Sequence, residues 1–497
     1  MAIKRYFANA DNTITNAYKE DLLTRGTGSN MGQADILETF SIYGQESSTS
    51  SELSRILIKF PINQISSDLA ADIIPSSGVS YYLKLFNARH SQTLPKNYKL
   101  DVLAVSSSWE EGNGLDMEGY SDETYGGIGS NWINASSSGP WTSEGGDYHA
   151  SPAFTQSFDI GNEDLEVDVT TLVTDWLNGD KENYGFGIKL SASYEASSSS
   201  NPTGAEFSYY TKKFFARSSE YYFDRPVLEA RWDSTRRDNR GNFYFSSSLA
   251  PAAENLNKLY MYNYIRGNLR DIGGNSAARP VLNLYYSSGS APEGDALYFR
   301  DSSNNAVNFL SASRESTGVY YASFSVTGGA VSTTYPYLVD VWSMSGSELH
   351  TGSVIIPNSH SFSNYNPNTK YVMNIKNLKP KYTRGQTERF RLYVREKNWS
   401  PNIYTVAKTT AKNLLIESAS YQICRAPDQK IVIPYGTGST AETLLSYDSD
   451  GNYFDLDMDL LEAGYTYEVK FSFYEDSLSS YREQPYKFKI RVEQDEY

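Results

Sequence analysis

An acid-rich run from Ser106 to Glu123, SSSWEEGNGLDMEGYSDE, gathers six carboxylates, one tryptophan and three glycines. Paired carboxylates can cleave glycosidic bonds, and the run offers Glu110, Glu111, Asp116 and Glu118. The two carboxyl groups of a glycosidase flank the sugar from different walls of a cleft, which neighbours in one loop rarely do. The run therefore predicts no catalytic residue.

Metal binding is the second chemistry that acidic loops can perform. Asp116, Glu118 and Asp122 would bring hard oxygen ligands to a loop that glycine allows to turn, although EF-hand spacing is absent. They are the candidate calcium ligands, and no other cofactor is expected. A second acidic stretch, residues 447–459, offers either a metal loop or a hairpin around Asp450–Gly451. The hairpin is favoured, because an Asp-Gly pair readily adopts the positive φ of tight turns.

Three indoles in the Gly- and Ser-rich run 109–147 offer a third chemistry, the stacking of sugar rings. If Trp109, Trp132 and Trp141 are exposed, they predict a glycan-binding platform. The alternative for Trp109 is structural. It follows the apolar strand LDVLAV, so it would anchor the end of that strand while the glycines turn the loop.

Charge is unevenly distributed along the chain. Between Asp101 and Asp180 there are sixteen Asp or Glu and no Lys or Arg, whereas Lys370 to Lys397 holds nine Lys or Arg against two Glu. One hypothesis is docking of an acidic first domain against a basic third domain within an assembly, with Arg389, Arg391 and Arg395 as contacts. The alternative is that both are solvated faces.

The totals narrow the function classes. A formal charge of −15 opposes binding to phosphate backbones, so no nucleic-acid partner is expected. One cysteine and four scattered histidines disfavour disulfides and zinc sites. Neither a signal peptide nor an apolar stretch of about 18 residues is visible, which predicts folding in a cytoplasm without a membrane partner. GxSxG, Walker and HExxH motifs are absent in a supporting context, so the chain is expected to be non-enzymatic.

The elements that must position these residues are short strands. Alternating or β-branched runs such as ILETFSIYG (36–44), SRILIKFPI (54–62) and YKLDVLAVS (98–106) recur between Ser, Gly, Asn and Pro, which predicts an all-β protein. One short helix is expected within 165–180, where Leu172, Val173, Trp176 and Leu177 share a face, Asp168 or Thr170 caps the start, and Gly179 suits the left-handed stop.

The organisation predicted from these runs is three β-sandwich domains in tandem. A jelly-roll-like domain spans residues 1–233, and a linker with a short helical turn spans 234–258. Two immunoglobulin-like domains follow, over 259–378 and 379–497. The last two long alternating strands, GYTYEVKFSFYED and QPYKFKIRVEQ, are expected to pair and close the third domain.

The first 233 residues resemble a DNRLRE-type domain, related to carbohydrate-binding modules described as alginate-binding. The resemblance rests on YFANADNTI (6–14), SRILIKF (54–60), LDVLAVSSSWEEGNG (100–114), VDVTTLVTDWLNG (167–179), NYGFGIKL (183–190) and RPVLEARW (225–232). It implies a β-sandwich attached to other modules and lacking catalytic residues, with Trp109 and Glu111 at the matching W-x-E-G positions.

The remaining chain is similar to virion structural proteins of contractile-tailed bacteriophages, notably those of cyanobacteria and other marine hosts. The segments that carry the similarity are SSSLAPAAENLNKLYMYNYIRGNLRDI, LLEAGYTYEVKFSFYED and EQPYKFKIRVEQ. The resemblance implies a virion component on the neck, tail, baseplate or capsid exterior, assembled in the host cytoplasm from copies of itself and other virion proteins. The alternative function is a glycan-binding module that attaches to host surface polysaccharide.

Overall fold

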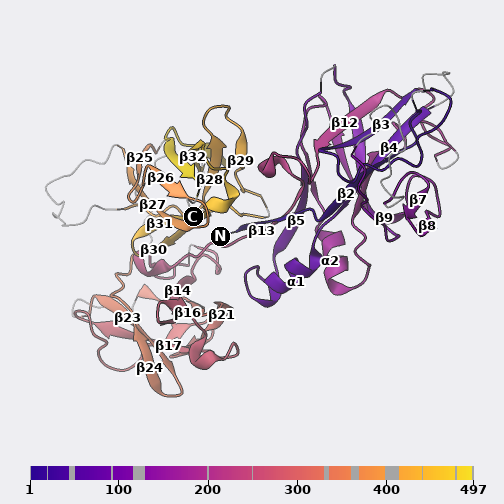
Figure 1. Ribbon diagram of the computed structural model, residues 1–497. Helices are drawn as coiled ribbons and strands as arrows, with labels where there is room; N and C mark the ends of the chain where they lie inside the picture. Colours follow the sequence, from indigo (N-terminus) through magenta and orange to yellow (C-terminus); the bar gives the residue numbers. More distant parts are fainter. Residues whose placement is uncertain are drawn as a thin grey trace. The chain divides into compact units, whose positions relative to one another are not determined.

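The chain forms two compact units that meet at the Trp232–Asp233 bond. The computed structural model describes residues 2–19, 21–43, 51–90, 93–115, 129–198, 201–248, 250–328, 335–359, 369–397, 413–438, 440–475 and 478–494. Figure 1 labels the elements of both units. Strands dominate both, so the predicted all-β fold class is confirmed.

The first unit, Ala2–Trp232, is a sandwich of two antiparallel sheets. One has four strands in the order β1 (Ile3–Phe7), β13 (Val227–Trp232), β5 (Val79–Leu85) and β10 (Leu165–Asp168). The other has seven: β12 (Tyr210–Phe215), β3 (Ile36–Tyr43), β4 (Ser51–Lys59), β11 (Phe186–Leu190), β6 (Tyr98–Val105) and β9 (Tyr148–Phe158), with β2 (Ala10–Thr15) also pairing with β4. A small hairpin joins β7 (Asn134–Ser136) to β8 (Gly139–Pro140).

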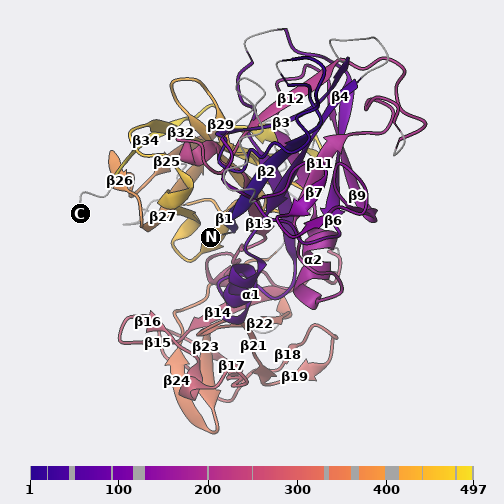
Figure 2. The ribbon, with the colours of Figure 1, turned by 45° about the vertical axis from the view of Figure 1, so that its right-hand side comes forward.

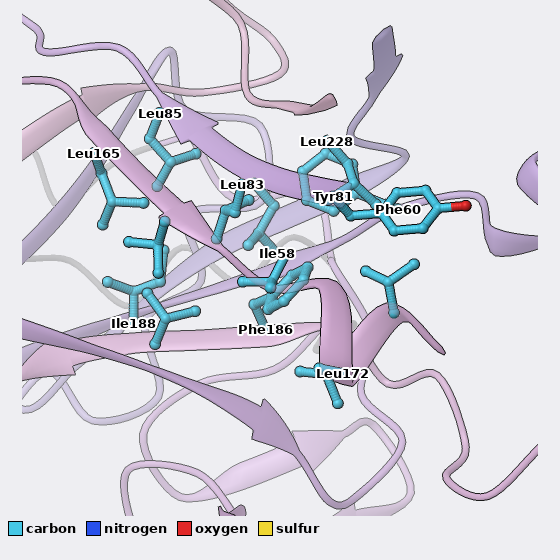
Figure 3. Packing of buried hydrophobic residues seen from close by; sticks show 14 of the residues in the cluster. Ile58, Phe60, Tyr81, Leu83, Leu85, Leu165, Leu172, Phe186, Ile188 and Leu228 are labelled. Atoms are coloured by element: carbon cyan, nitrogen blue, oxygen red, sulfur yellow. The ribbon is translucent and has the colours of Figure 1, made fainter. Parts of the chain in front are cut away.

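The main core of this unit lies between the two sheets. Figure 3 shows Leu83 and Leu85 of β5 with Ile58 of β4 and Ile188 of β11, all fully buried. The period-two alternation of the sequence produces this face. In β6, for example, Tyr98, Leu100 and Val102 are buried, whereas Lys99 between them is exposed.

Two short helices seal one end of the sandwich, where Figures 1 and 2 both show them. The predicted helix is confirmed as α2 (Thr170–Asn178): it buries Trp176 and ends at Gly179, whose φ of 79° is left-handed. The expected cap is wrong, because Val169 is the N-cap and makes no side-chain cap hydrogen bond, although Asp168 accepts from the N–H of Thr170 at 2.9 Å. The other helix, α1 (Ile62–Ala70), was not predicted from the sequence. It begins directly after Pro61, and it buries only Ile62, Ile65 and Asp68, which is too short a stripe to show helical periodicity.

The outer face of the four-stranded sheet carries a charge network. Glu229 accepts hydrogen bonds from Arg5 Nε at 2.8 Å and from Arg231 Nε at 2.7 Å. Arg231 also donates to Glu166 at 2.6 Å, and Lys84 lies 3.4 Å from the same carboxylate. Although burial opposes ionisation, the positive charges of Lys84, Arg5 and Arg231 hold the pKa of Glu229 well below its ordinary value.

The second unit begins with a sandwich of two small sheets around one core. The first sheet contains β14 (Asn257–Tyr262), β22 (Val319–Phe324) and β21 (Ser313–Ser316). The second contains β20 (Leu310–Ser311), β17 (Val281–Ser287), β23 (Tyr337–Met344) and β24 (Ser347–Thr351). Two hairpins complete it: β15 (Tyr264–Ile265) with β16 (Asn268–Leu269), and β18 (Phe299–Arg300) with β19 (Ala306–Val307).

A further sandwich occupies the rest of the second unit. Its four-stranded sheet has the order β25 (Tyr371–Ile375), β27 (Thr387–Glu396), β31 (Gly451–Asp457) and β30 (Ser446–Asp448). Its six-stranded sheet contains β26 (Lys381–Thr383), β34 (Phe488–Glu493), β32 (Thr466–Glu475), β28 (Ala419–Arg425) and β29 (Ile431–Ile433), with β33 (Ser480–Glu483) pairing with β32. The expected closing pair is confirmed, because β34 pairs antiparallel with β32.

The segment expected to be a linker is built into the second unit. Phe243 and Phe245 are buried in the core of the first sandwich of this unit, so residues 234–258 are not a free connection. The predicted helical turn near Pro251 is a turn at residues 252–255, and β14 follows it at Asn257. Two large aromatic side chains would otherwise remain exposed to water, which explains why this segment folds onto the core.

Candidate functional site

The indoles of the acid-rich region form an apolar cluster on the far face of the seven-stranded sheet. Leu53 and Leu57 of β4 point into this cluster, whereas Ile56 and Ile58 between and beside them enter the main core. Trp109 is half-buried against the cluster, and its Nε1 donates to the carbonyl oxygen of Tyr184 at 2.7 Å. These contacts agree with the structural alternative, in which Trp109 anchors the chain after β6.

Trp132 and Trp141 are core residues of this cluster. Each is only 5% exposed, and Trp141 Nε1 donates to the carbonyl oxygen of Asn131 at 2.8 Å. The expectation of an exposed stacking platform made by Trp109, Trp132 and Trp141 is therefore wrong for Trp132 and Trp141, and Trp109 is half-buried. The large apolar area of an indole is removed from water by the loops of residues 129–148, which fold over the sheet instead of leaving it open.

A buried ion pair supports the same cluster from the sheet. Arg55 donates from Nε to Glu195 Oε1 and from Nη2 to Glu195 Oε2, both at 3.0 Å, and from Nη1 to the carbonyl oxygen of Gly145 at 2.9 Å. The guanidinium carbon lies 5.2 Å from the centre of the Trp132 ring. Both charges are almost fully buried, so each depends on its partners within the chain for compensation.

Glu111, one of the candidate carboxylates of the opening run, is held in a clamp. Arg217 donates through Nη2 to Glu111 Oε2 at 2.6 Å and through Nε to Glu111 Oε1. The backbone N–H of Asp11 donates to the same Oε1 at 2.8 Å, and the backbone N–H of Arg217 donates to Asp11 Oδ2 at 2.6 Å. Glu111 therefore joins three distant segments of the chain and is not free to act on a substrate.

Asp11 is the least compensated group in this clamp. Its side chain is completely buried, and Oδ1 has no hydrogen-bond partner. Burial raises the pKa of Asp11 to about 7, and the negative charge of Glu111 adds to this, although the N–H and the charge of Arg217 oppose it. Near neutral pH this carboxyl group is thus divided between its protonated and ionised forms.

Asn30 fixes both sides of the acid-rich loop. Its Nδ2 donates to the carbonyl oxygens of Glu111 at 2.7 Å and Ser130 at 2.8 Å, and its Oδ1 accepts from the N–H of Gly114 at 2.9 Å. A Cβ atom at Gly112 would lie within 2.6 Å of the Asn30 amide group, and the φ of Gly112 is +84°. Glycine is required here by close approach as well as by conformation.

The candidate calcium ligands Asp116, Glu118 and Asp122 lie outside the described residues. Within the part of the chain that the structure describes, no group of three or more His, Cys, Asp or Glu side chains is placed to hold a metal ion. The second acidic stretch forms the favoured hairpin: β30 and β31 pair antiparallel, with Asp448 opposite Gly451.

Two of the three arginines predicted for assembly contacts are paired within their own sheet. Arg389 donates to both carboxylate oxygens of Asp455, at 2.8 and 2.9 Å, and Arg391 donates to both of Asp448, at 2.9 and 3.0 Å. Arg395 lies half-buried further along β27, opposite Val372. Arg389 and Arg391 therefore already have carboxylate partners in their own sheet, and their role as assembly contacts stays a prediction.

The segment after Trp232 forms a junction within the second unit, which we call the 233–242 junction. The Arg236 carbonyl accepts from Tyr447 N–H at 2.9 Å, and the Asp238 N–H donates to the Tyr447 carbonyl at 3.0 Å, as in a parallel strand pair beside β30. On its other side, Arg236 Nε donates to Glu315 of β21 at 2.7 Å. The same short segment thus bonds to both sandwiches of this unit.

Arg240 completes the junction with a buried ion pair. Its Nη2 donates to Asp340 of β23 at 2.5 Å and to the carbonyl oxygen of Tyr260 at 2.9 Å, while its Nη1 donates to Asp238 at 2.6 Å. Asp340 is completely buried and also accepts from Trp342 Nε1 at 2.6 Å. The composition of residues 233–242 indicated a polar, basic linker, but the sequence carried no sign of these distant carboxylate partners.

Glu111 was singled out from the sequence, but the partners that hold it and its loop, Asp11, Asn30 and Arg217, were missed. Asp11 and Asn30 lie more than 75 residues from the run that they hold, and Arg217 lies about as far on the other side. The sequence of β2, ADNTIT, is mostly polar and gives no sign that its residues from Asp11 onwards are all buried.

Comparisons with known proteins assign no family to this chain. No family model matches the chain, and no curated protein matches it. Among solved structures, a chimeric titin Z1Z2 tandem is 12% identical, covers 48% of this chain and 91% of its own, and has a TM-score of 0.14. A DUF4785 family protein from Legionella pneumophila is 9% identical over 98% of this chain and 92% of its own, with a TM-score of 0.12. Similarities this low carry no argument about function.

One further property concerns membranes. Among the helices of the described residues, none has the length and apolar character that crossing a bilayer demands.

Proposed function

We propose that this protein is a multi-copy structural component of a tailed-phage particle, located on the neck, tail, baseplate or capsid exterior, and that it acts through protein contacts without catalysis. The 233–242 junction is the observation that carries the proposal. It bonds through its backbone to Tyr447 and through Arg236 and Arg240 to Glu315 and Asp340, so two sandwiches are coupled into one unit. Coupled sandwiches suit a spacer that must keep its length under load.

The clamp in the first unit supports the same proposal. Glu111, which the sequence offered as a possible catalytic carboxylate, bonds to Arg217 of this chain. Asp448 and Asp455, from the second-unit stretch that offered a metal loop, bond to Arg391 and Arg389. These ion pairs therefore stabilise the fold of this chain. The glycan-binding alternative loses the tryptophan platform on which it rested, because Trp132 and Trp141 are buried.

Quantitative mass spectrometry of purified particles tests the proposal directly. The chain is expected in particles at several copies for each copy of a single-copy reference protein, and it should survive washing with high salt. Its absence from particles that contain the other structural proteins would refute the proposal.

The coupling role of the junction can be tested separately by hydrogen exchange on the purified chain. In the Arg240→Met variant, Asp340 loses its buried partner, so the amides of Asp238 and Tyr447 should exchange at least ten-fold faster. Arg279→Met is the matched control, because Arg279 is exposed and donates only to nearby carbonyl oxygens. Equal exchange in the two variants would contradict coupling through Arg240.

A further inference from the structure

A group of cationic side chains is exposed on the six-stranded sheet of the second unit. Lys489 and Arg491 alternate along β34, Lys381 lies opposite Arg491 on β26, and Lys487 precedes β34. Their side chains are 66%, 53%, 65% and 50% exposed, respectively. These four residues are called the basic face.

Two carboxylates partly balance the basic face. Glu468 of β32 lies 3.7 Å from Lys487 and 3.8 Å from Lys489, and its side chain is only 9% exposed. Glu493 lies 2.8 Å from Lys381 and 3.5 Å from Arg491. Four cations thus meet two anions, one of which, Glu468, is largely buried. Exposed pairs of this kind contribute little to stability, so the cations can bind another partner at low cost.

The first unit, in contrast, is strongly acidic. Residues 1–232 hold 17 Lys and Arg against 31 Asp and Glu, a formal charge of −14, whereas residues 233–497 hold 27 against 28, a formal charge of −1. Nearly all the net charge of the protein is therefore in the first unit. The stretch from Asp101 to Asp180, with sixteen acids and no base, accounts for all of it, because the rest of the first unit holds 17 Lys and Arg against 15 Asp and Glu.

We propose that the basic face docks on the acidic first unit of a second copy of this chain, giving a head-to-tail contact. The partner is a second copy because the chain itself supplies the complementary charge, and because a spacer present in many copies meets its own acidic unit at high local concentration. A contact between different surfaces of identical subunits closes into a ring or continues as a filament. This inference deepens the proposed function and rests on it.

Arg389 and Arg391, the residues predicted from sequence for such docking, are not part of the basic face. They belong to the opposite sheet of the same sandwich and are held by Asp455 and Asp448. The local excess of basic residues was visible in the sequence, but which of them carry satisfied charges depends on strand pairing.

Sedimentation velocity of the full chain, over a range of salt concentrations, tests the inference. The wild-type chain should associate at about 50 mM salt and dissociate at about 500 mM, because a docking contact between exposed charges is screened. The variant K489E/R491E should weaken association at least ten-fold. The control K96E/K99E makes the same change of net charge at exposed lysines of the first unit and should associate as the wild type does, or more tightly.

Each outcome of these experiments supports or overturns the docking inference. A wild-type chain that stays monomeric at every salt concentration overturns the inference, and so does association of K489E/R491E equal to that of the wild type. If the wild-type chain is monomeric but its basic face binds a polyanionic polysaccharide, the occupant is a glycan and the second-copy inference is also overturned. These results are separate from the proposed function, since a chain found in purified particles that does not self-associate would retain the function and lose only the docking contact.

Discussion

Replacing Asp11 by asparagine should stabilise the first unit above pH 7 and should lose that benefit in acid. The ordinary pKa of 3.8 applies to the unfolded chain, and burial raises the folded value to about 7. The folded state then binds this proton more tightly than the unfolded state, so stability falls as pH rises from about 4 to about 7. The steepest change is about 1.4 kcal/mol per pH unit, for one proton.

The magnitude follows from the size of the shift. A displacement of about 3 pKa units corresponds to about 4 kcal/mol of destabilisation at pH 8, when Asp11 is ionised in both states. The asparagine amide can still accept from Arg217 N–H, but its NH₂ group takes the place of the unpartnered Oδ1, at a cost of about 1–3 kcal/mol. The expected net gain at pH 8 is about 1–3 kcal/mol, decreasing toward zero or below at pH 4.

Urea unfolding followed by tryptophan fluorescence at pH 4, 6 and 8 measures this effect. Five of the seven tryptophans lie within residues 1–232, so the signal mainly follows the first unit. Asp159→Asn, at an exposed carboxylate of the same unit, is the control and should leave the pH dependence unchanged. If wild type and Asp11→Asn show the same pH dependence, the account of Asp11 as a buried, uncompensated carboxyl group is refuted.

Three other changes probe the remaining structural claims. Arg240→Met should cost about 3–5 kcal/mol in the second unit by leaving buried Asp340 without its cation, measured by calorimetry. Trp132→Ala should cost about 3–5 kcal/mol in the first unit through the cavity it leaves, and an unchanged urea midpoint would show that this indole is exposed. Glu229→Gln should cost about 3 kcal/mol at pH 7, because the lowered pKa of Glu229 stabilises the folded state above pH 4.5. The difference in stability between this variant and the wild type should shrink as pH falls, and thermal unfolding at pH 3 and 7 measures it.

The sequence predicts those parts of the fold that repeat locally. Strands such as β6 and the helix α2 could be placed because each shows its own periodicity, and Gly179 marks a helix end with a conformation that few residues adopt. A hairpin was predictable here from a local Asp-Gly signal, although the turn residues are Ser449 and Asp450, and Gly451, with a φ of +124°, lies opposite Asp448 at the start of β31.

The parts that could not be predicted depend on contacts between distant segments. Whether Trp132 faces solvent is decided by loops folding over β4, and whether Arg389 is free is decided by its register opposite Asp455. The Asp11–Glu111–Arg217 clamp spans more than 200 residues, so neither composition nor spacing reveals it. A charged residue that is paired in the fold cannot be told from an unpaired one by its sequence, because the difference lies in the partners that the fold brings to it.

The 233–242 junction also determines where the chain can be divided. Phe243 and Phe245 fill one core of the second unit, and the segment before them pairs with Tyr447 of the other sandwich. A cut near residue 258 would therefore expose apolar side chains on one fragment and an unpaired strand edge on the other. A cut at Trp232–Asp233 would break neither core. Recombination between related genes should therefore exchange residues 233–497 as a single block, and natural breakpoints should gather near residue 232, away from the apparent boundary between the two smaller sandwiches.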